Sequence, residues 1–198
     1  MQAISKTYID ANASKNSKDD LRRNVLNEIK DIPPVEKQKF SQTIENNLAK
    51  KLNAKQGLWG AFRPLPSEPQ LNFAQVSQTI KWCYPVVIEN NLLFKKDVTE
   101  FRKNELGFFE PCDGTEVSVS ELAGVIMPGL AFDLSGARLG RGLGYYDRAL
   151  KNYSGLIIGV CFHRSLKEGI PFEEHDVKCQ IIVTENQSVE VEGVKLWM

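Results

Sequence analysis

Short apolar runs that alternate with segments of helical periodicity constrain the fold of this chain most strongly. The continuous apolar runs cover residues 122–127, 156–162 and 180–184. Such runs are typical of strands that are buried on both faces, as strands in parallel sheets are. Their alternation with helices predicts an α/β fold with helices on both faces of the sheet. We therefore expect a single three-layer domain whose mostly parallel (mixed) sheet is flanked by helices.

The N-terminal part of the chain contains two segments with clear helical periodicity. Apolar side chains recur at positions 21, 25, 26 and 29, and then every fourth residue from 40 to 52. Ser17 is suited to cap the first helix. Pro33 and Pro34 end that helix, and the second helix is expected to begin near residue 35 or 36. Weaker patterns predict helices over residues 73–80 and about 145–153.

The remaining segments of the chain carry shorter or weaker patterns. Residues 1–16 are rich in Asn, Ser, Ala and Lys and are expected to form a flexible tail, so that 17–198 is the α/β domain. Residues 97–116 contain two glycines and a proline and are expected to be irregular. The remaining expectations are strands over 58–62 and 84–88, a strand over 92–94 that pairs with the second of these, and a hairpin around 192–193 or a lone strand within 189–197.

Composition excludes several classes of function. The chain has 198 residues with 25 basic and 25 acidic side chains, so its net charge is zero. A broad nucleic-acid-binding face usually makes a domain basic, so no nucleic-acid partner is expected. The sequence contains no signal-peptide core and no apolar run of about 18 residues, which predicts no membrane association and a cytoplasmic location. The four cysteines match no zinc pattern, and we expect reduced thiols in a monomer.

A glycine-rich loop follows the strand predicted over residues 122–127. Gly140, Gly142 and Gly144 alternate with other residues, and arginines stand at 138, 141 and 148. Glycine lets backbone N–H groups approach a ligand closely, and successive N–H groups form an anion-binding nest. Arginine adds a planar, permanently charged fork that suits phosphate. The loop matches neither a P-loop nor the dinucleotide fingerprint. A plain surface turn before a helix is the alternative, but it needs fewer glycines and no flanking arginines.

The residues around this loop resemble one family closely. The resemblance rests on Pro128-Gly129-Leu130-Ala131-Phe132-Asp133, Gly136, Arg138-Leu139-Gly140-Arg141-Gly142 and Gly144-Tyr145-Tyr146-Asp147. This pattern is similar to the signature of 5-formyltetrahydrofolate cyclo-ligases, which are also called methenyltetrahydrofolate synthetases. The resemblance covers roughly residues 18–185. It implies an α/β enzyme that uses ATP and 5-formyltetrahydrofolate as substrates and Mg²⁺ as cofactor.

The resemblance also implies roles for particular residues. Lys18 and Arg22 match a Lys-x-x-x-Arg pattern that contacts ATP in the family. Without the resemblance, two cations four residues apart would be interpreted as a solvent-exposed basic face of a helix. Arg141 and Tyr145 are the expected catalytic residues. The other expected ATP contacts are Arg138, Leu139, Gly140, Arg141, Gly142, Leu143, Gly144, Tyr145 and Tyr146. The expected folate contacts are Arg63, Glu68, Arg141, Gly142, Leu143, Gly144 and Tyr145.

Two aspartates are implied as Mg²⁺ ligands. Asp147 ends the glycine motif, and Asp176 precedes the strand predicted over residues 180–184. Mg²⁺ typically takes one or two carboxylates and keeps water and phosphate ligands besides. Without the resemblance, Asp147 would be read as a residue of a helix N-terminus and Asp176 as an ordinary loop residue.

The implied reaction transfers the γ-phosphoryl group of ATP to the formyl oxygen, after which N10 attacks the activated carbon and phosphate leaves. Leu143 departs from the family pattern, which usually has Lys or Gly there, and residues 69–72 replace a segment that normally starts near a Thr. Leu143 supports the main alternative, a non-catalytic module that binds nucleotide or folate. A sugar-phosphate or CoA enzyme of related architecture is a third reading, which rests on fold alone.

Overall fold

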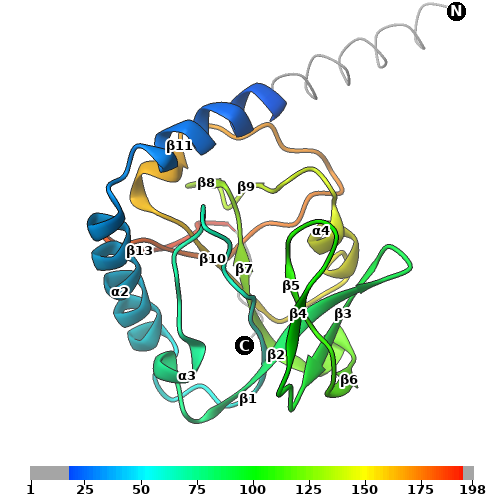
Figure 1. Cartoon of the computed structure of the whole chain (residues 1–198). Helices are drawn as coiled ribbons and strands as arrows, with labels where there is room; N and C mark the ends of the chain where they lie inside the picture. Colours follow the sequence, from blue (N-terminus) through cyan, green and yellow to red (C-terminus); the bar gives the residue numbers. More distant parts are fainter. Residues whose placement is uncertain (1–17, 194–198) are drawn as a thin grey trace, which may run out of the picture.

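The computed structural model describes residues 18–193 (Figure 1). The tail expected over 1–16, the cap at Ser17 and the last residues of the 189–197 segment lie outside the described residues. Residues 18–30 are helical, as predicted. The other helices are α2 (Pro34–Lys51), α3 (Phe73–Val76) and α4 (Tyr145–Ala149), with 3-10 turns η1 (Val119–Glu121) and η2 (His163–Ser165).

An eight-stranded sheet forms the centre, in the order β13-β12-β10-β7-β1-β2-β3-β6. Its five central strands pair in parallel, and the outer strands are antiparallel, so the predicted mixed α/β sheet is confirmed. The parallel strands are β1 (Gly57–Gly60), β2 (Ile80–Ile88), β7 (Leu122–Pro128), β10 (Leu156–Val160) and β12 (Ile181–Val183). The antiparallel strands are β3 (Asn91–Lys96), β6 (Thr115–Val117) and β13 (Ser188–Glu190).

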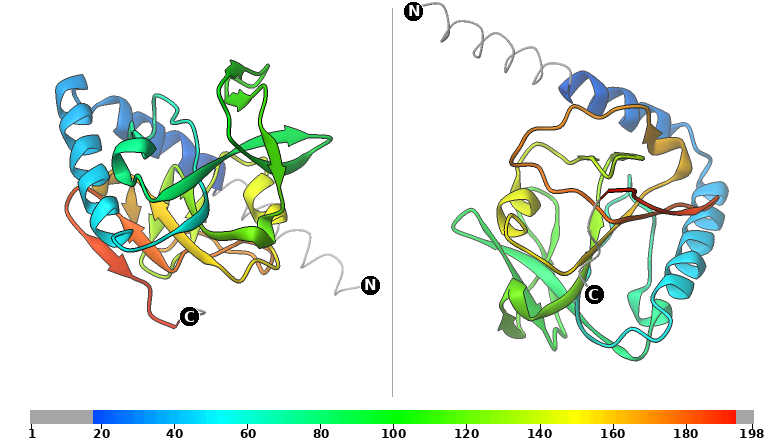
Figure 2. Two further views of the ribbon diagram at one scale, coloured as in Figure 1. Left: turned by 90° about the horizontal axis from the view of Figure 1, so that it is seen from below. Right: turned by 180° about the vertical axis from the view of Figure 1, so that it is seen from behind.

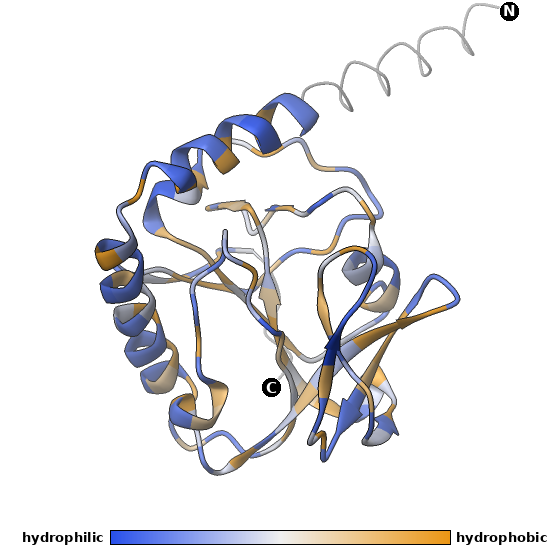
Figure 3. Ribbon diagram, in the orientation of Figure 1, coloured by the Kyte–Doolittle hydropathy of each residue, from blue (hydrophilic) through white to orange (hydrophobic). Residues whose placement is uncertain are grey.

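Two apolar clusters lie on opposite faces of this sheet. Along β7, Ile126 belongs to one cluster, whereas Val125 and Met127 belong to the other, because successive strand residues point to opposite faces. The helix over 18–30 and α2 cover the Ile126 face, and α4 packs on the opposite face. In Figure 3 hydrophobic residues concentrate along the strands, and the outer face of α2 is mostly hydrophilic. Among residues 18–193, no helix has the length and apolarity needed to cross a membrane.

Two helix predictions were too long. The segment over 73–80 is helical only in α3, because Ser77 adopts an extended backbone and Ile80 begins β2, where it pairs with Gly57. The helix expected over 145–153 ends at Ala149, and Tyr153 instead donates its hydroxyl to the carbonyl of Leu122. In both cases a residue that packs against the core, buried Ile80 or half-buried Tyr153, continues the helical spacing although it lies outside the helix.

The expectation that residues 97–116 are irregular is wrong. They contain β4 (Phe101–Lys103), β5 (Phe109–Pro111) and β6, and β4 pairs with β5 in an antiparallel ribbon. The turn of this ribbon is held by Asn104, whose side chain accepts a hydrogen bond from the N–H of Phe108. Strands of three residues are too short to show an alternating pattern. Figure 2 shows the ribbon standing out from the sheet.

The C-terminal segment adds an edge strand to the sheet. Val189 lies in β13, which pairs with β12 across a turn at residues 184–187. The second arm of the hairpin expected around 192–193 lies outside the described residues. A separate three-stranded sheet has the order β11-β8-β9, and the glycine loop begins directly after β9. Its strands are β8 (Ala131–Asp133), β9 (Arg138–Leu139) and β11 (Leu166–Lys167).

Replacing Gly124 with alanine should destabilise the protein by about 1–3 kcal/mol, because overpacking a full core typically costs this much. A Cβ on Gly124 would overlap the indole ring of Trp59, which is fully buried in the neighbouring strand β1. Urea denaturation measures the loss. The overlap is with the outer, six-membered ring of the indole. Phenylalanine is smaller than tryptophan, so the same substitution in a Trp59→Phe background should cost clearly less. Equal costs in the two backgrounds would show that the indole is not the obstacle.

Candidate active site

A cleft of about 950 Å³ opens where β1 and β7 end. Phe62 follows β1, and Pro128 and Gly129 close β7, so the cleft lies at the carboxyl ends of parallel strands, the usual place for a ligand in such folds. Every residue to which the sequence assigned a role lines it. These residues are Lys18, Arg22, Arg63, Glu68, Arg138, Leu139, Gly140, Arg141, Gly142, Leu143, Gly144, Tyr145, Tyr146, Asp147 and Asp176.

The turn between β8 and β9 fixes the start of the glycine loop. Asp133 is buried, and one of its carboxylate oxygens accepts hydrogen bonds from the N–H groups of Ser135 and Ala137. Its other oxygen accepts the N–H of Ile170 from a distant segment, at 2.7 Å. Gly136 has φ of +83°, which only glycine adopts easily. Asp133 and Gly136 thus build the turn that leads into the glycine loop.

Arg148 holds the far end of the glycine loop. Its guanidinium donates to the carbonyl of Leu143 at 2.9 Å and to the carbonyl of Asn90, in the β2–β3 turn, at 3.1 Å. The same guanidinium lies 5.3 Å from the ring centre of Tyr145. Gly144 has φ of +65°, and a Cβ there would lie 2.8 Å from the Arg148 guanidinium. Arg148 thus joins the loop to the wall formed by β2 and β3.

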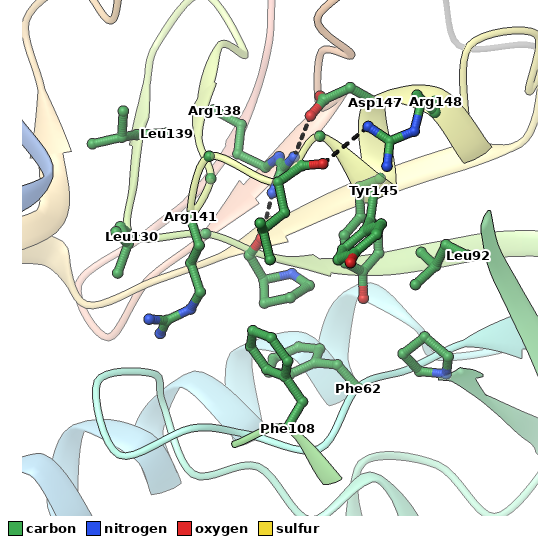
Figure 4. A pocket seen from close by; sticks show the side chains of 18 of the residues that line it. Phe62, Leu92, Phe108, Leu130, Arg138, Leu139, Arg141, Tyr145, Asp147 and Arg148 are labelled. Carbon is green, nitrogen blue, oxygen red and sulfur yellow. Dashed lines mark hydrogen bonds and ion pairs between the residues drawn. The ribbon is translucent and has the colours of Figure 1, made fainter. Parts of the chain in front are cut away.

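Arg138 lies beneath the loop and is nearly buried, with a side chain 8% exposed. It donates to Asp147 at 2.8 Å and to the carbonyl of Pro128 at 3.3 Å. A Cβ on Gly140 would lie 2.8 Å from this guanidinium, so Gly140 also provides space for the arginine. In this arrangement Arg138 is chiefly the partner of Asp147. Figure 4 shows the pair at one end of the cleft.

The helix over 18–30 reaches the loop through its first two turns. Arg22 donates through Nε to the carbonyl of Gly140 at 2.9 Å. Lys18 donates to Glu173 at 2.8 Å and to Asp176 at 2.9 Å. Burial lowers the pKa of Lys18, but its hydrogen bonds to these two carboxylates outweigh burial, so the pKa is raised and the side chain is cationic. Two cations therefore lie beside the glycine loop.

Asp147 and Asp176 lie on adjoining segments. The N–H of Val177 donates to Asp147 at 3.2 Å, so the residue after Asp176 touches the other aspartate directly. Each carboxylate pairs with a cation, Asp147 with Arg138 and Asp176 with Lys18. Within residues 18–193 no cluster of three or more His, Cys, Asp or Glu side chains is arranged to hold a metal. Two carboxylates fit Mg²⁺ that takes its other ligands from phosphate and water.

Glu68 and Arg141 form an ion pair inside the cleft. Arg141 donates through one nitrogen, Nη2, to Glu68 at 3.1 Å and to the hydroxyl of Ser67 at 2.6 Å. The second oxygen of Glu68 accepts the N–H of Leu65 at 3.0 Å. Burial raises the pKa of Glu68 above its ordinary value of 4.5, and the hydrogen bond from Leu65 and the charge of Arg141 offset only part of that effect. Arg63 lies nearby with its guanidinium 4.6 Å from the ring centre of Phe101.

Sequence reasoning missed the apolar wall of the cleft. This wall includes Phe62, Leu92 and Phe108, which Figure 4 shows around the same cavity as Tyr145. Phe108 comes from the β4–β5 ribbon, which had been read as irregular. The ribbon is tied to the sheet by Glu110, whose carboxylate accepts the N–H of Val87 at 3.1 Å. An apolar wall with a few polar groups is the usual form of a small-molecule site.

The fold and cleft define an α/β protein whose site combines cations, a glycine loop and paired carboxylates at one end with an apolar pocket at the other. The chain belongs to the 5-formyltetrahydrofolate cyclo-ligase family, whose model matches residues 14–185.

Individual relatives support the same placement. A 5-formyltetrahydrofolate cyclo-ligase of Escherichia coli K12 is 39% identical over 101 residues, which is 48% of this chain and 56% of the relative. The cyclo-ligase of Saccharomyces cerevisiae is 37% identical over 73 residues, 33% of this chain and 35% of the relative. The aligned segments thus span between about a third and just over half of these relatives.

Two solved structures share the fold over most of their length. The 5,10-methenyltetrahydrofolate synthetase of Aquifex aeolicus has a TM-score of 0.75 and 26% identity, covering 91% of this chain and 96% of that one. A 5,10-methenyltetrahydrofolate synthetase from Mycoplasma pneumoniae has a TM-score of 0.71 over 85% of this chain and 98% of that one. Its identity is 21%, so this second likeness concerns the fold alone.

Proposed function

We propose that the protein converts 5-formyltetrahydrofolate to 5,10-methenyltetrahydrofolate at the expense of ATP, with release of ADP and phosphate. Family membership supports this reaction. The observation that carries it for this chain is that one cleft contains both a cationic glycine loop and a buried carboxylate beside an apolar wall. The first suits the phosphates of ATP, and the second suits the pterin, whose amino and ring N–H groups form a pair of donors.

The two ends of the cleft take different substrates in this proposal. Lys18, Arg22 and the loop from Arg138 to Tyr146 bind ATP, and Asp147 with Asp176 holds Mg²⁺. Glu68 and Arg63 bind the folate, and residues 141–145 border both substrates. Mg²⁺ would neutralise charge on the phosphates, as it does in other phosphoryl transfers. Arg138 and Lys18, which pair with the two aspartates in this structure, hold these carboxylates in position.

The chemistry requires activation of a poor electrophile. The formyl oxygen attacks the γ-phosphorus, a new P–O bond forms, and the bond from the γ-phosphorus to the bridging oxygen breaks to release ADP. N10 then attacks the formyl carbon, loses its proton, and phosphate leaves with the former formyl oxygen. No covalent nucleophile from the protein is needed. Arg141 and the loop N–H groups stabilise the negative charge during phosphoryl transfer.

The test is to mix the protein with MgATP and 5-formyltetrahydrofolate and to follow the absorbance of the methenyl product. The proposal requires product that depends on both substrates. Binding of ATP or folate without product would instead favour the non-catalytic module, for which Leu143 is the supporting feature; it is exposed in the cleft and brings no charge to the loop. Single-domain organisation over 17–198, a monomeric state and a cytoplasmic location remain predictions.

A further inference from the structure

Arg141 points away from the phosphate-binding end in this structure. Figure 4 shows its side chain extending away from Asp147 and Arg138. Its contacts are instead Ser67 and Glu68, which lie on the segment after β1 and not in the glycine loop. The Arg141 side chain is 29% exposed, whereas Glu68 is 6% exposed, so the arginine is the member of the pair that has room to leave.

Each substrate competes with this pair from a different side. The pterin needs the carboxylate of Glu68, one oxygen of which is already engaged by Arg141. The phosphates of ATP need the guanidinium of Arg141, which is engaged by Ser67 and Glu68. A ligand that binds alone must therefore break the contacts of Arg141, and this lowers its apparent affinity. A second ligand then finds the contacts already broken and avoids that cost.

We propose that the Arg141–Ser67–Glu68 contacts couple the two substrate sites, so that the folate and the nucleotide each bind more tightly when the other is present. The inference rests on the proposed function, since it takes the folate to bind at Glu68 and the nucleotide at Arg141. Coupling of this kind is reciprocal: each ligand changes the affinity for the other by the same factor. Binding of the folate also frees the guanidinium of Arg141 from Ser67 and Glu68, so that it can turn toward the glycine loop and the nucleotide.

Calorimetric titration tests the coupling directly. The probes are 5-formyltetrahydrofolate and the β,γ-imido analogue of MgATP, which cannot transfer its terminal phosphoryl group. Each is titrated into the full chain alone and in the presence of saturating amounts of the other. The wild-type protein should bind each probe about tenfold more tightly when the other is bound, within the range usual for coupled sites.

Ser67→Ala provides the discriminating variant, because Ser67 holds Arg141 but does not line the cleft. Losing the hydroxyl weakens only the state in which Arg141 is held. Each probe alone should then bind at least about threefold more tightly, while binding to the protein that already holds the other probe stays unchanged. The coupling factor falls accordingly, and kcat at saturation is unaltered. Ser120→Ala, an exposed serine on η1, serves as the matched control and should behave like wild type.

Two results would overturn the inference while leaving the proposed function standing. One is a wild-type protein that forms the methenyl product and binds both probes with no coupling. The other is weaker binding of each single probe to Ser67→Ala, which would mean that Ser67 supports the bound state. If neither probe binds and no product forms, the proposed function fails, and the coupling fails with it.

Discussion

Replacing Arg141 with alanine should lower kcat by about 100- to 1,000-fold, the usual loss when one donor to a developing negative charge is removed. The residue stands between Gly140 and Gly142 in the anion-binding loop, and its side chain is partly exposed in the cleft. No core packing is lost, so the unfolding transition in urea should remain cooperative. Arg141→Lys should recover only part of the rate, because an ammonium group cannot reproduce the guanidinium fork.

Arg23→Ala is the matched control for this experiment. Arg23 lies on the same helix as the cleft residues Lys18 and Arg22, but its side chain is 75% exposed and pairs with Asp20. Its loss should leave kcat and KM for ATP unchanged. Near-wild-type turnover in a folded Arg141→Ala protein would remove Arg141 from the mechanism.

Glu68→Gln should raise KM for the folate by about 10- to 100-fold, which corresponds to the loss of a hydrogen bond to a charged group. Glutamine has nearly the shape of glutamate and still offers one oxygen to Arg141, but its amide nitrogen faces one pterin donor. KM for ATP should change much less. Glu116→Gln on the edge strand β6 is exposed and should leave both KM values unaltered. An unchanged folate KM in Glu68→Gln would place the pterin elsewhere.

The stability of the same variant relative to wild type should rise as the pH approaches neutrality. Because burial raises the folded-state pKa of Glu68 above 4.5, ionisation of this carboxyl destabilises the folded protein. The wild-type protein therefore loses stability relative to Glu68→Gln as pH rises from about 4.5 through the raised pKa, and the difference is constant above it. Urea denaturation at a series of pH values from about pH 4 to about pH 7.5 measures this difference. A constant difference, or an advantage of wild type that grows with pH, would contradict it.

Opposite effects on function and stability distinguish a binding residue from a structural one. A buried glutamate retained only for folding would stabilise the protein, and its replacement would reduce both activity and stability. Glu68 is expected to weaken the fold at neutral pH and to be needed for the folate. Strained or unfavourable groups of this kind concentrate at functional sites.

The sequence predicted the central sheet because its strands are continuous apolar runs. Residues 122–127 and 156–162 correspond to β7 and β10, which lie in the middle of the sheet and are buried on both faces. The peripheral strands were less visible. The β4–β5 ribbon depends on backbone pairing and on the side chain of Asn104, and neither produces a periodic pattern over three residues.

The part of the site that one contiguous motif forms was predictable from the sequence. The glycine loop and Asp147 are contiguous, so their grouping follows from the sequence. The contacts that set the state of each residue are not contiguous. Lys18 meets Glu173 and Asp176 across more than 150 residues, and Arg141 meets Glu68 across 73. Arg148 has no visible partner in the sequence because both of its acceptors are backbone carbonyls.

The most direct test of the account measures the stoichiometry of the reaction. Purified protein is mixed with MgATP and 5-formyltetrahydrofolate, and the methenyl product and ADP are quantified in the same samples. The account predicts one methenyltetrahydrofolate for each ADP, no product without ATP, and a large loss of both in Arg141→Ala. Methenyl formation without ATP, or ADP formation without the folate product, would contradict it.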